Sequence, residues 1–356
     1  PGGKIMDVGI CVPSHVGDID YVVRAEALGY SHAWLADSQM LWSDCYAALA
    51  LAADRTSKIK IGTGVAITGT RPAAVNAAGI ATINAMAPGR TFFGVGSGNT
   101  ATRIMGLPPH RIAQYDRYLS EIRPLLKGEE AQMQHGSREI PIKHVMPDKG
   151  FVNFEDTIPM YVSGFGPRSL GLAGKHGDGA VITFPSSAAM MEKIWLMLEA
   201  DGEVKRDEFY VTALTAMVVL DKGEAVDSDR VRHECGAMAM ATVHYAYDQY
   251  RNFGHQPPNH LAGLWGDYVK MLEAVPEERR HQRIHWGHNC WVHPEEEKFL
   301  TKDLLQSTCL IGTQDELLEK LNALGEAGMD QVMNLPNFDP RSEVLERVAK
   351  DIIPFL

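Results

Sequence analysis

The fold is decided by residues 32–96, which read HAWLADSQMLWSDCYAALALAADRTSKIKIGTGVAITGTRPAAVNAAGIATINAMAPGRTFFGVG. Three short runs rich in apolar and β-branched residues are typical of buried strands: His32–Asp37, Lys60–Ile67 and Thr91–Gly96. Two Ala-rich segments with helical periodicity separate them, Tyr46–Thr56 and Pro72–Met86. This order of strand, helix and strand predicts parallel βα units.

The same alternation extends in both directions along the chain. Further strands are expected at Met6–Pro13, Met160–Ser163, Gly179–Phe184, Thr212–Leu220 and Gln331–Leu335. Further helices are expected at Asp18–Leu28, Ile112–Leu126, Arg168–His176, Ala188–Ala200, Thr313–Ala327 and Arg341–Ile353. Asp18 is a residue type that caps helices, so it is expected to cap the first one. Eight strands joined mostly by helices predict an α/β TIM (β/α)8 barrel. The absence of a Gly-x-Gly-x-x-Gly motif after the first strand argues against a doubly wound sheet.

Two segments interrupt this pattern. Residues 127–159 are polar and have no clear period, which predicts an irregular excursion. Residues 221–310 contain no evident strand, are helical in places and are rich in His, Trp and Tyr. We expect them to form a helical insertion between strands seven and eight, within one domain that spans residues 1–356.

Composition excludes several classes of protein. The net charge of -11 and the pI of about 5.7 argue against a nucleic-acid-binding surface. No apolar stretch approaches the roughly 20 residues that cross a bilayer, so no membrane association is expected. The five cysteines form no Cys-x-x-Cys pair, which favours reduced thiols and a cytoplasmic protein.

Active sites of such barrels lie at the carboxyl ends of the strands. After the fifth strand comes SGFGPRS (Ser163–Ser169), where glycines, a helix N-terminus and Arg168 could bind a phosphate. A plain βα turn with a solvated arginine is the alternative. Asp37 ends a hydrophobic strand and could accept a hydrogen bond from a cofactor ring, or it could order a loop.

The insertion carries His281, His285 and His288 at helical spacing. Neighbouring arginines would repel a cation, and no carboxylate or thiolate stands at ligand spacing, so no metal site is predicted. The aromatic residues of the insertion indicate a pocket wall, a subunit interface or a small core of its own. Neither a Gly-x-Ser-x-Gly elbow nor a Walker motif supports a hydrolase or a kinase.

Residues 25–98, together with residues 158–183 (IPMYVSGFGPRSLGLAGKHGDGAVIT) and 311–335, resemble the luciferase-like monooxygenases. Within that superfamily they are most similar to the branch that contains methylenetetrahydromethanopterin reductase. The resemblance implies FMN or coenzyme F-420 at the strand ends and a cis peptide at Gly64–Val65. Implied ring contacts are Asp37, Ser38, Gly64, Val65, Ser97 and Gly98, and implied phosphate contacts are Gly164, Gly166, Pro167 and Arg168.

Position at the strand ends adds Asn99, Phe165 and Thr183 to the expected cofactor contacts. Trp42, Tyr245 and Trp286 are expected to line the substrate pocket. Two positions depart from the family. Many relatives have a histidine in place of Ser38, and the sugar-phosphate dehydrogenases of the deazaflavin branch have a glutamate in place of Asn99. His15 and Asp44 are the remaining candidates for a catalytic acid or base.

Three hypotheses follow from the sequence. The first is an FMN-dependent monooxygenase that uses oxygen on a small organic substrate and receives reduced flavin from a separate flavin reductase. The second is an F-420-dependent reductase or dehydrogenase that transfers hydride. The third is a barrel without flavin that acts as a binding protein or as a hydrolase. The family also implies a homodimer or homotetramer.

Overall fold

The computed structural model describes residues 6–356. Within them, eight parallel strands close a barrel in the order β1-β12-β9-β8-β7-β4-β3-β2. The strands are β1 (Asp7–Val12), β2 (His32–Leu35), β3 (Lys60–Ile67), β4 (Thr91–Gly96), β7 (Met160–Ser163), β8 (Gly179–Thr183), β9 (Tyr210–Thr215) and β12 (Gln331–Asn334). The predicted TIM barrel is therefore confirmed.

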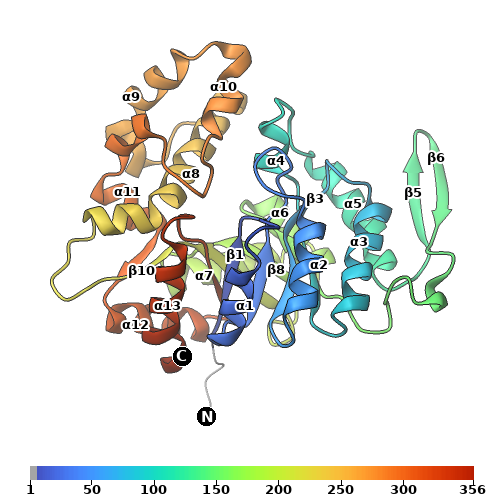
Figure 1. The fold of residues 1–356 in the computed structure, drawn as a ribbon. Coiled ribbons are helices and arrows are strands. Elements are labelled where there is room, and N and C mark those ends of the chain that lie inside the picture. Colours follow the sequence, from blue (N-terminus) through green and yellow to red (C-terminus); the bar gives the residue numbers. More distant parts are fainter. Residues whose placement is uncertain (1–5) are drawn as a thin grey trace.

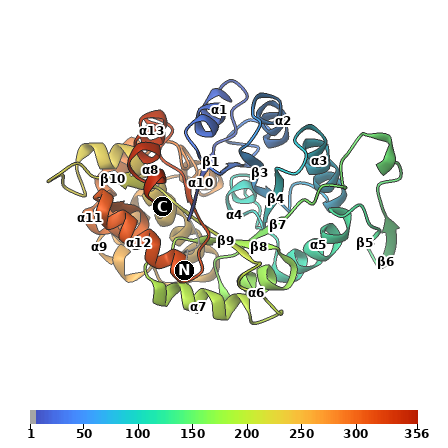
Figure 2. The same cartoon turned by 90° about the horizontal axis from the view of Figure 1, so that it is seen from below.

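Helices surround the barrel and bury its outer face, as Figure 2 shows from below. They are α1 (Asp20–Ala27), α2 (Cys45–Arg55), α3 (Ala73–Met86), α5 (Ile112–Leu125), α6 (Pro167–His176), α7 (Ala188–Leu198), α12 (Gln314–Glu326) and α13 (Arg341–Asp351). The main hydrophobic core lies between these helices and the strands. It explains why the strands are almost continuously apolar, since both of their faces are covered.

Aromatic side chains fill the barrel interior. The ring centroids of Trp34 and Phe92 are 4.3 Å apart, and those of Phe92 and Tyr161 are 5.5 Å apart. The indole N–H of Trp34 donates to Gln331 Oε1 at 2.8 Å, which satisfies this buried donor. Cys11 and Leu335 belong to the same cluster and also line the cavity described below. The packed interior thus supports the site from beneath.

Four α-helices stand together beside the barrel mouth: α8 (Asp229–Phe253), α9 (Ala262–Glu273), α10 (Glu277–Ile284) and α11 (Lys302–Thr308) (Figure 1). They lie in the chain between β10 (Met217–Val219) and β11 (Leu310–Gly312). A second hydrophobic cluster holds them, with Tyr247, Tyr268 and Leu304 almost fully buried. None of the helices described is long and apolar enough to cross a membrane.

The structure corrects three local predictions. The excursion is not wholly irregular, because β5 (Ala131–His135) and β6 (Arg138–Ile142) form an antiparallel hairpin at the edge of the molecule (Figure 1). The predicted seventh strand is divided at Ala216: β9 stays in the barrel, and β10 pairs with β11. A continuous apolar run cannot reveal that its two halves belong to different sheets.

The third correction concerns the first helix. It begins at Asp20, and the preceding Ile19 gives it no side-chain cap. The Asp18 carboxylate pairs instead with the guanidinium of Arg341, from the last α-helix. Asp18 therefore pairs with Arg341 instead of capping the helix. The sequence around Asp18 cannot reveal a partner that lies so far along the chain.

Candidate active site

A cavity of about 330 Å³ lies at the carboxyl ends of the barrel strands. Its volume is within the range of roughly 300–1,000 Å³ that is usual for small-molecule sites. Two sets of residues enclose it. We call the strand-end residues Gly64, Val65, Ser97, Gly98 and Gly164 the floor, and Arg103, Tyr245, Gln249, His288 and Asn289 the roof.

The floor is built largely from backbone. The Gly64–Val65 peptide bond is cis, as the family resemblance implies. Gly98 has φ of 92°, and an added Cβ would lie 2.3 Å from Ile67 Cγ2, so only glycine fits there. The single hydroxyl proton of Tyr115, from α5, is shared between the carbonyls of Val95 at 2.9 Å and Ser163 at 3.0 Å, which joins β4 to the end of β7. The floor is therefore a narrow, fixed surface that could lie against a planar ring.

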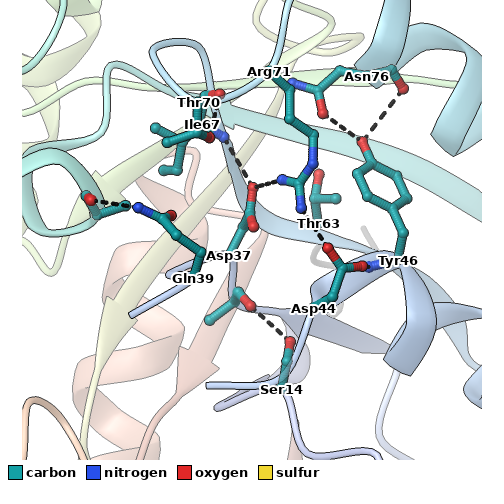
Figure 3. Close-up of polar contacts among 12 residues, drawn as sticks. Ser14, Asp37, Gln39, Asp44, Tyr46, Thr63, Ile67, Thr70, Arg71 and Asn76 are labelled. Carbon is teal, nitrogen blue, oxygen red and sulfur yellow. Dashed lines mark hydrogen bonds and ion pairs between the residues drawn. The ribbon is translucent and has the colours of Figure 1, made fainter. Parts of the chain in front are cut away.

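Asp37 is held beside the floor by an ion pair (Figure 3). Its Oδ2 lies 2.5 Å from Arg71 Nη1, and only 2% of its side chain is exposed. The other amine of Arg71 contacts Asp44 Oδ2 at 2.7 Å. Asp44 also caps α2, since its Oδ1 accepts from the backbone N–H groups of Tyr46 and Ala47. One arginine thus fixes the loop after β2 to the loop after β3.

The turn between β7 and α6 borders the cavity through Gly164, Phe165 and Gly166. Ser169 Oγ accepts the N–H groups of Phe165 and Gly166, each at 3.2 Å. The first N–H groups of α6, at Arg168 and Ser169, have no acceptor among residues 6–356. Arg168 is exposed, and no other atom of the described part of the chain lies within 4 Å of a Cβ built on Gly166. This open helix N-terminus is suited to a phosphate.

The roof is polar and is contributed by the short helix α4 (Asn99–Arg103), by α8 and by the loop after α10. Arg103 Nε donates to Asn99 Oδ1 at 2.7 Å and lies 3.7 Å from Asp248 Oδ2. His288 Nε2 is 3.3 Å from Thr100 Oγ1. Contacts of α4 with the insertion therefore close the cavity above the strand ends.

Burial sets the charges of His288 in the roof and of Asp248 and His285, which lie behind it. It raises the pKa of Asp248 to about 6, against which Arg103 acts in the opposite direction. Burial lowers the pKa of His285 to about 2 and that of His288 to about 3. Both histidines are thus neutral at neutral pH, and Arg103 is the one lysine or arginine among the described residues that line the cavity.

The structure brings most of the predicted site residues to the cavity. Lining residues among them are Asp37, Ser38, Trp42, Gly64, Val65, Ser97, Gly98, Asn99, Gly164, Phe165, Gly166 and Tyr245. Pro167, Arg168 and Thr183 stand outside this lining, the first two at the start of α6 and the third at the end of β8.

Three further predicted residues also lie outside the cavity lining. His15 is exposed, and its Nδ1 accepts from Gly17 N at 3.0 Å. Asp44 is occupied by its helix cap and by Arg71. Trp286 is 49% exposed and packs edge-on against His293, with ring centroids 4.8 Å apart. The geometry therefore gives neither His15 nor Asp44 a catalytic position.

The three histidines of the insertion do not share a helix face, because α10 ends at Ile284, before His285 and His288. Within residues 6–356, no group of three or more His, Cys, Asp or Glu residues is arranged to hold a metal. Sequence reasoning missed Arg103, Gln249 and Asn289. The four-residue spacing of Asn99 and Arg103 was the available signal for the first, since such pairs meet on a helix.

A closed parallel barrel with its cavity at the carboxyl ends of the strands defines a TIM-barrel enzyme. A sequence model described as luciferase-like monooxygenase matches residues 7–331. The chain therefore belongs to the luciferase-like monooxygenase family, as its sequence predicted.

Two curated relatives match along almost their whole length. Methylenetetrahydromethanopterin reductase of Archaeoglobus fulgidus is 28% identical over 345 residues, which are 94% of each chain. F-420-dependent glucose-6-phosphate dehydrogenase of Beutenbergia cavernae is 26% identical over 361 residues, covering 94% of this chain and 92% of the relative. Both relatives are oxidoreductases, and both fall within or beside the branch that the sequence resembles.

Two solved structures have the same fold. The coenzyme F-420-dependent tetrahydromethanopterin reductase of Methanopyrus kandleri gives a TM-score of 0.68 at 20% identity, over 98% of this chain and 99% of that one. The second is the oxygenating component of 3,6-diketocamphane monooxygenase from Pseudomonas putida, in complex with FMN. Its TM-score is 0.64 at 18% identity, over 99% of this chain and 98% of that one. At these identities the likeness establishes the barrel fold.

Proposed function

We propose that this protein is an F-420-dependent oxidoreductase that transfers hydride to or from a small organic substrate. The observation that carries the proposal is the cavity itself. Its floor joins the ends of β3, β4 and β7, where the family resemblance expects a flavin-type ring. The relatives named above favour coenzyme F-420, because one that matches 94% of this chain is an F-420-dependent glucose-6-phosphate dehydrogenase.

The residues present fit such a cofactor. The backbone of the floor offers a flat surface, and the free N–H groups of Arg168 and Ser169 offer a phosphate site at the neighbouring turn. The bound deazaflavin supplies or accepts a hydride. The chain holds the ring in place, and the roof excludes water from the reacting faces.

The FMN-dependent monooxygenase is the second candidate. The specific observation in its favour is the FMN-containing structure with the same barrel. A protein of this kind receives reduced flavin from a separate reductase, and the strand-end floor would hold the FMN ring beside the cavity in which a small organic substrate could bind.

Titration of the full chain with coenzyme F-420 and with FMN, following the fluorescence of each, tests the proposal. We expect micromolar binding of F-420 and at least about tenfold weaker binding of FMN, a difference of about 1.4 kcal/mol. The reverse order would replace the proposal with the monooxygenase. Binding of neither would leave the flavin-free binding protein or hydrolase.

A further inference from the structure

Arg103 is a buried cation whose terminal amines have no hydrogen-bond partner among residues 6–356. The residue is 7% exposed and lines the cavity. Its Nε is occupied by Asn99 Oδ1, at 2.7 Å. Neither Nη1 nor Nη2 makes a hydrogen bond to any residue between 6 and 356. A guanidinium has five N–H donors in a planar fork, so four donors of Arg103 remain free in a mostly desolvated position.

The charge of Arg103 is balanced only in part. The nearest carboxylate oxygen, Asp248 Oδ2, lies 3.7 Å from Nε, which is an ion pair without a hydrogen bond. A buried charge is costly unless it is both paired and hydrogen-bonded. The Asp37 carboxylate also lines the cavity but already pairs with Arg71. No other described carboxylate on the cavity wall can complete the coordination of Arg103.

The other roof groups favour an anion as well. Tyr245 and Gln249 project from α8 into the cavity lining, and their side chains make no hydrogen bond within the described chain. Burial raises the pKa of Tyr245, so its hydroxyl keeps a proton to donate. Thr100, one turn before Arg103, lies on the same wall, where His288 Nε2 contacts its hydroxyl at 3.3 Å. Arg103, Tyr245 and Gln249 thus place donors without a partner among the described residues on the roof side of the cavity.

We propose that Arg103 recognises a carboxylate on the substrate, and that this contact directs the rest of the substrate toward the floor. The planar fork of Arg103 matches a carboxylate through two parallel N–H···O bonds. The role in orienting a reacting substrate rests on the proposed function. Binding of the carboxylate needs only the side chains named here.

A cofactor phosphate is the other source of an oxyanion in this cavity. The turn before α6 has its own cation, Arg168, and free backbone N–H groups. Arg168 and Arg103 belong to different elements, α6 and α4. Substituting one arginine at a time therefore shows which of them binds the cofactor phosphate and which binds the substrate carboxylate.

The test measures binding of benzoate and of neutral benzamide to the full chain by calorimetry, with and without saturating cofactor. We expect the wild type to prefer benzoate by about tenfold to a hundredfold, the range for hydrogen bonds to a charged group. Arg103→Gln is expected to abolish that preference, and Arg103→Lys to retain part of it. Arg168→Gln is expected to weaken cofactor binding while leaving the benzoate preference intact.

Arg103→Gln leaves Asp248 without its cation, so the double variant Arg103→Gln/Asp248→Asn serves as the fold control, with melting temperature as its measure. Loss of the benzoate preference in this folded double variant supports the proposal. Equal binding of benzoate and benzamide to the wild type would overturn it. A preference for benzoate that survives in Arg103→Gln would also overturn the proposal, as would a preference that disappears only in Arg168→Gln. The benzoate preference is also measured without cofactor. If the protein binds no flavin, the role of Arg103 in carboxylate binding is therefore still tested.

Discussion

The floor and the roof of the cavity are built in different ways. The floor consists of strand ends and glycine backbone, fixed by neighbouring barrel strands and by Tyr115 of α5, which contacts the carbonyls of Val95 and Ser163. The roof consists of side chains from α4 and the insertion, among them Arg103 and the buried, neutral His288. A fixed floor suits a cofactor shared across a family, whereas a side-chain roof suits a substrate that is particular to this chain.

The largest effect is expected where an ion pair supports the floor. Asp37→Asn removes the buried partner of Arg71 and should lower the free energy of unfolding by about 2–3 kcal/mol. Asp44→Asn is the matched control, because Asp44 contacts the same arginine but its side chain is 56% exposed. Asparagine also keeps the cap of α2, so this variant should lose less than about 1 kcal/mol. Urea unfolding measures the free energy of unfolding of both variants. Equal decreases would contradict the assignment of the buried Asp37–Arg71 ion pair as the main support of the floor.

The next effect concerns the roof and depends on pH. Burial raises the pKa of Asp248 to about 6 from its ordinary 3.8, so the folded protein holds this proton more tightly than the unfolded chain. The resulting stability is fully present below about pH 4 and is lost as pH rises through 6. Relative to Asp248→Asn, the wild type should lose about 2 kcal/mol of unfolding free energy between pH 4 and pH 7.5.

His285 and His288 act in the opposite direction, since a lowered histidine pKa destabilises the fold in acid. They are present in both proteins, so the difference between wild type and variant reports Asp248 together with its contact with His285, whose Nε2 lies 3.9 Å from Asp248 Oδ2. A constant difference across this pH range would show that the carboxylate is not desolvated by the roof.

A smaller effect tests the shape of the floor. Gly98→Ala and Gly223→Ala both place alanine at positive φ, with φ of 92° and 80°. No atom lies within 4 Å of the added Cβ at Gly223, whereas at Gly98 it would overlap Ile67. We expect Gly98→Ala to cost about 1–2 kcal/mol more than Gly223→Ala and to be the variant that weakens cofactor binding. Thermal unfolding and cofactor titration of the pair give the comparison.

The smallest effect separates two tryptophans that sequence reasoning placed in the pocket. Trp286 is half exposed and outside the cavity lining, so Trp286→Ala should change stability by less than about 0.5 kcal/mol and ligand affinity by less than about twofold. Trp42 lines the cavity, so Trp42→Ala should weaken benzoate binding by more than that. Calorimetric titration of both variants with benzoate measures the two affinities. A larger loss of affinity in Trp286→Ala than in Trp42→Ala would show that Trp286, and not Trp42, lines the ligand site.

The sequence predicted the floor better than the roof. Strand ends such as Ser97–Gly98 and Ser163–Gly164 follow from apolar periodicity and from the rule that parallel strands end on one face. The roof depends on long-range contacts: Asp248 reaches Arg103, and His288 reaches Thr100, across more than a hundred residues. The predicted helix cap at Asp18 was wrong for the same reason, since Arg341 from the other end of the chain pairs with its carboxylate.

The central claim is that the floor binds a deazaflavin ring. A crystal structure of the full chain with coenzyme F-420 tests it most directly. The account predicts the ring against Gly64–Val65 and Ser97–Gly98, the phosphate at the start of α6, and the terminal amines of Arg103 left facing the open part of the cavity. A ring bound away from these strand ends, or a phosphate bound to Arg103, would contradict it.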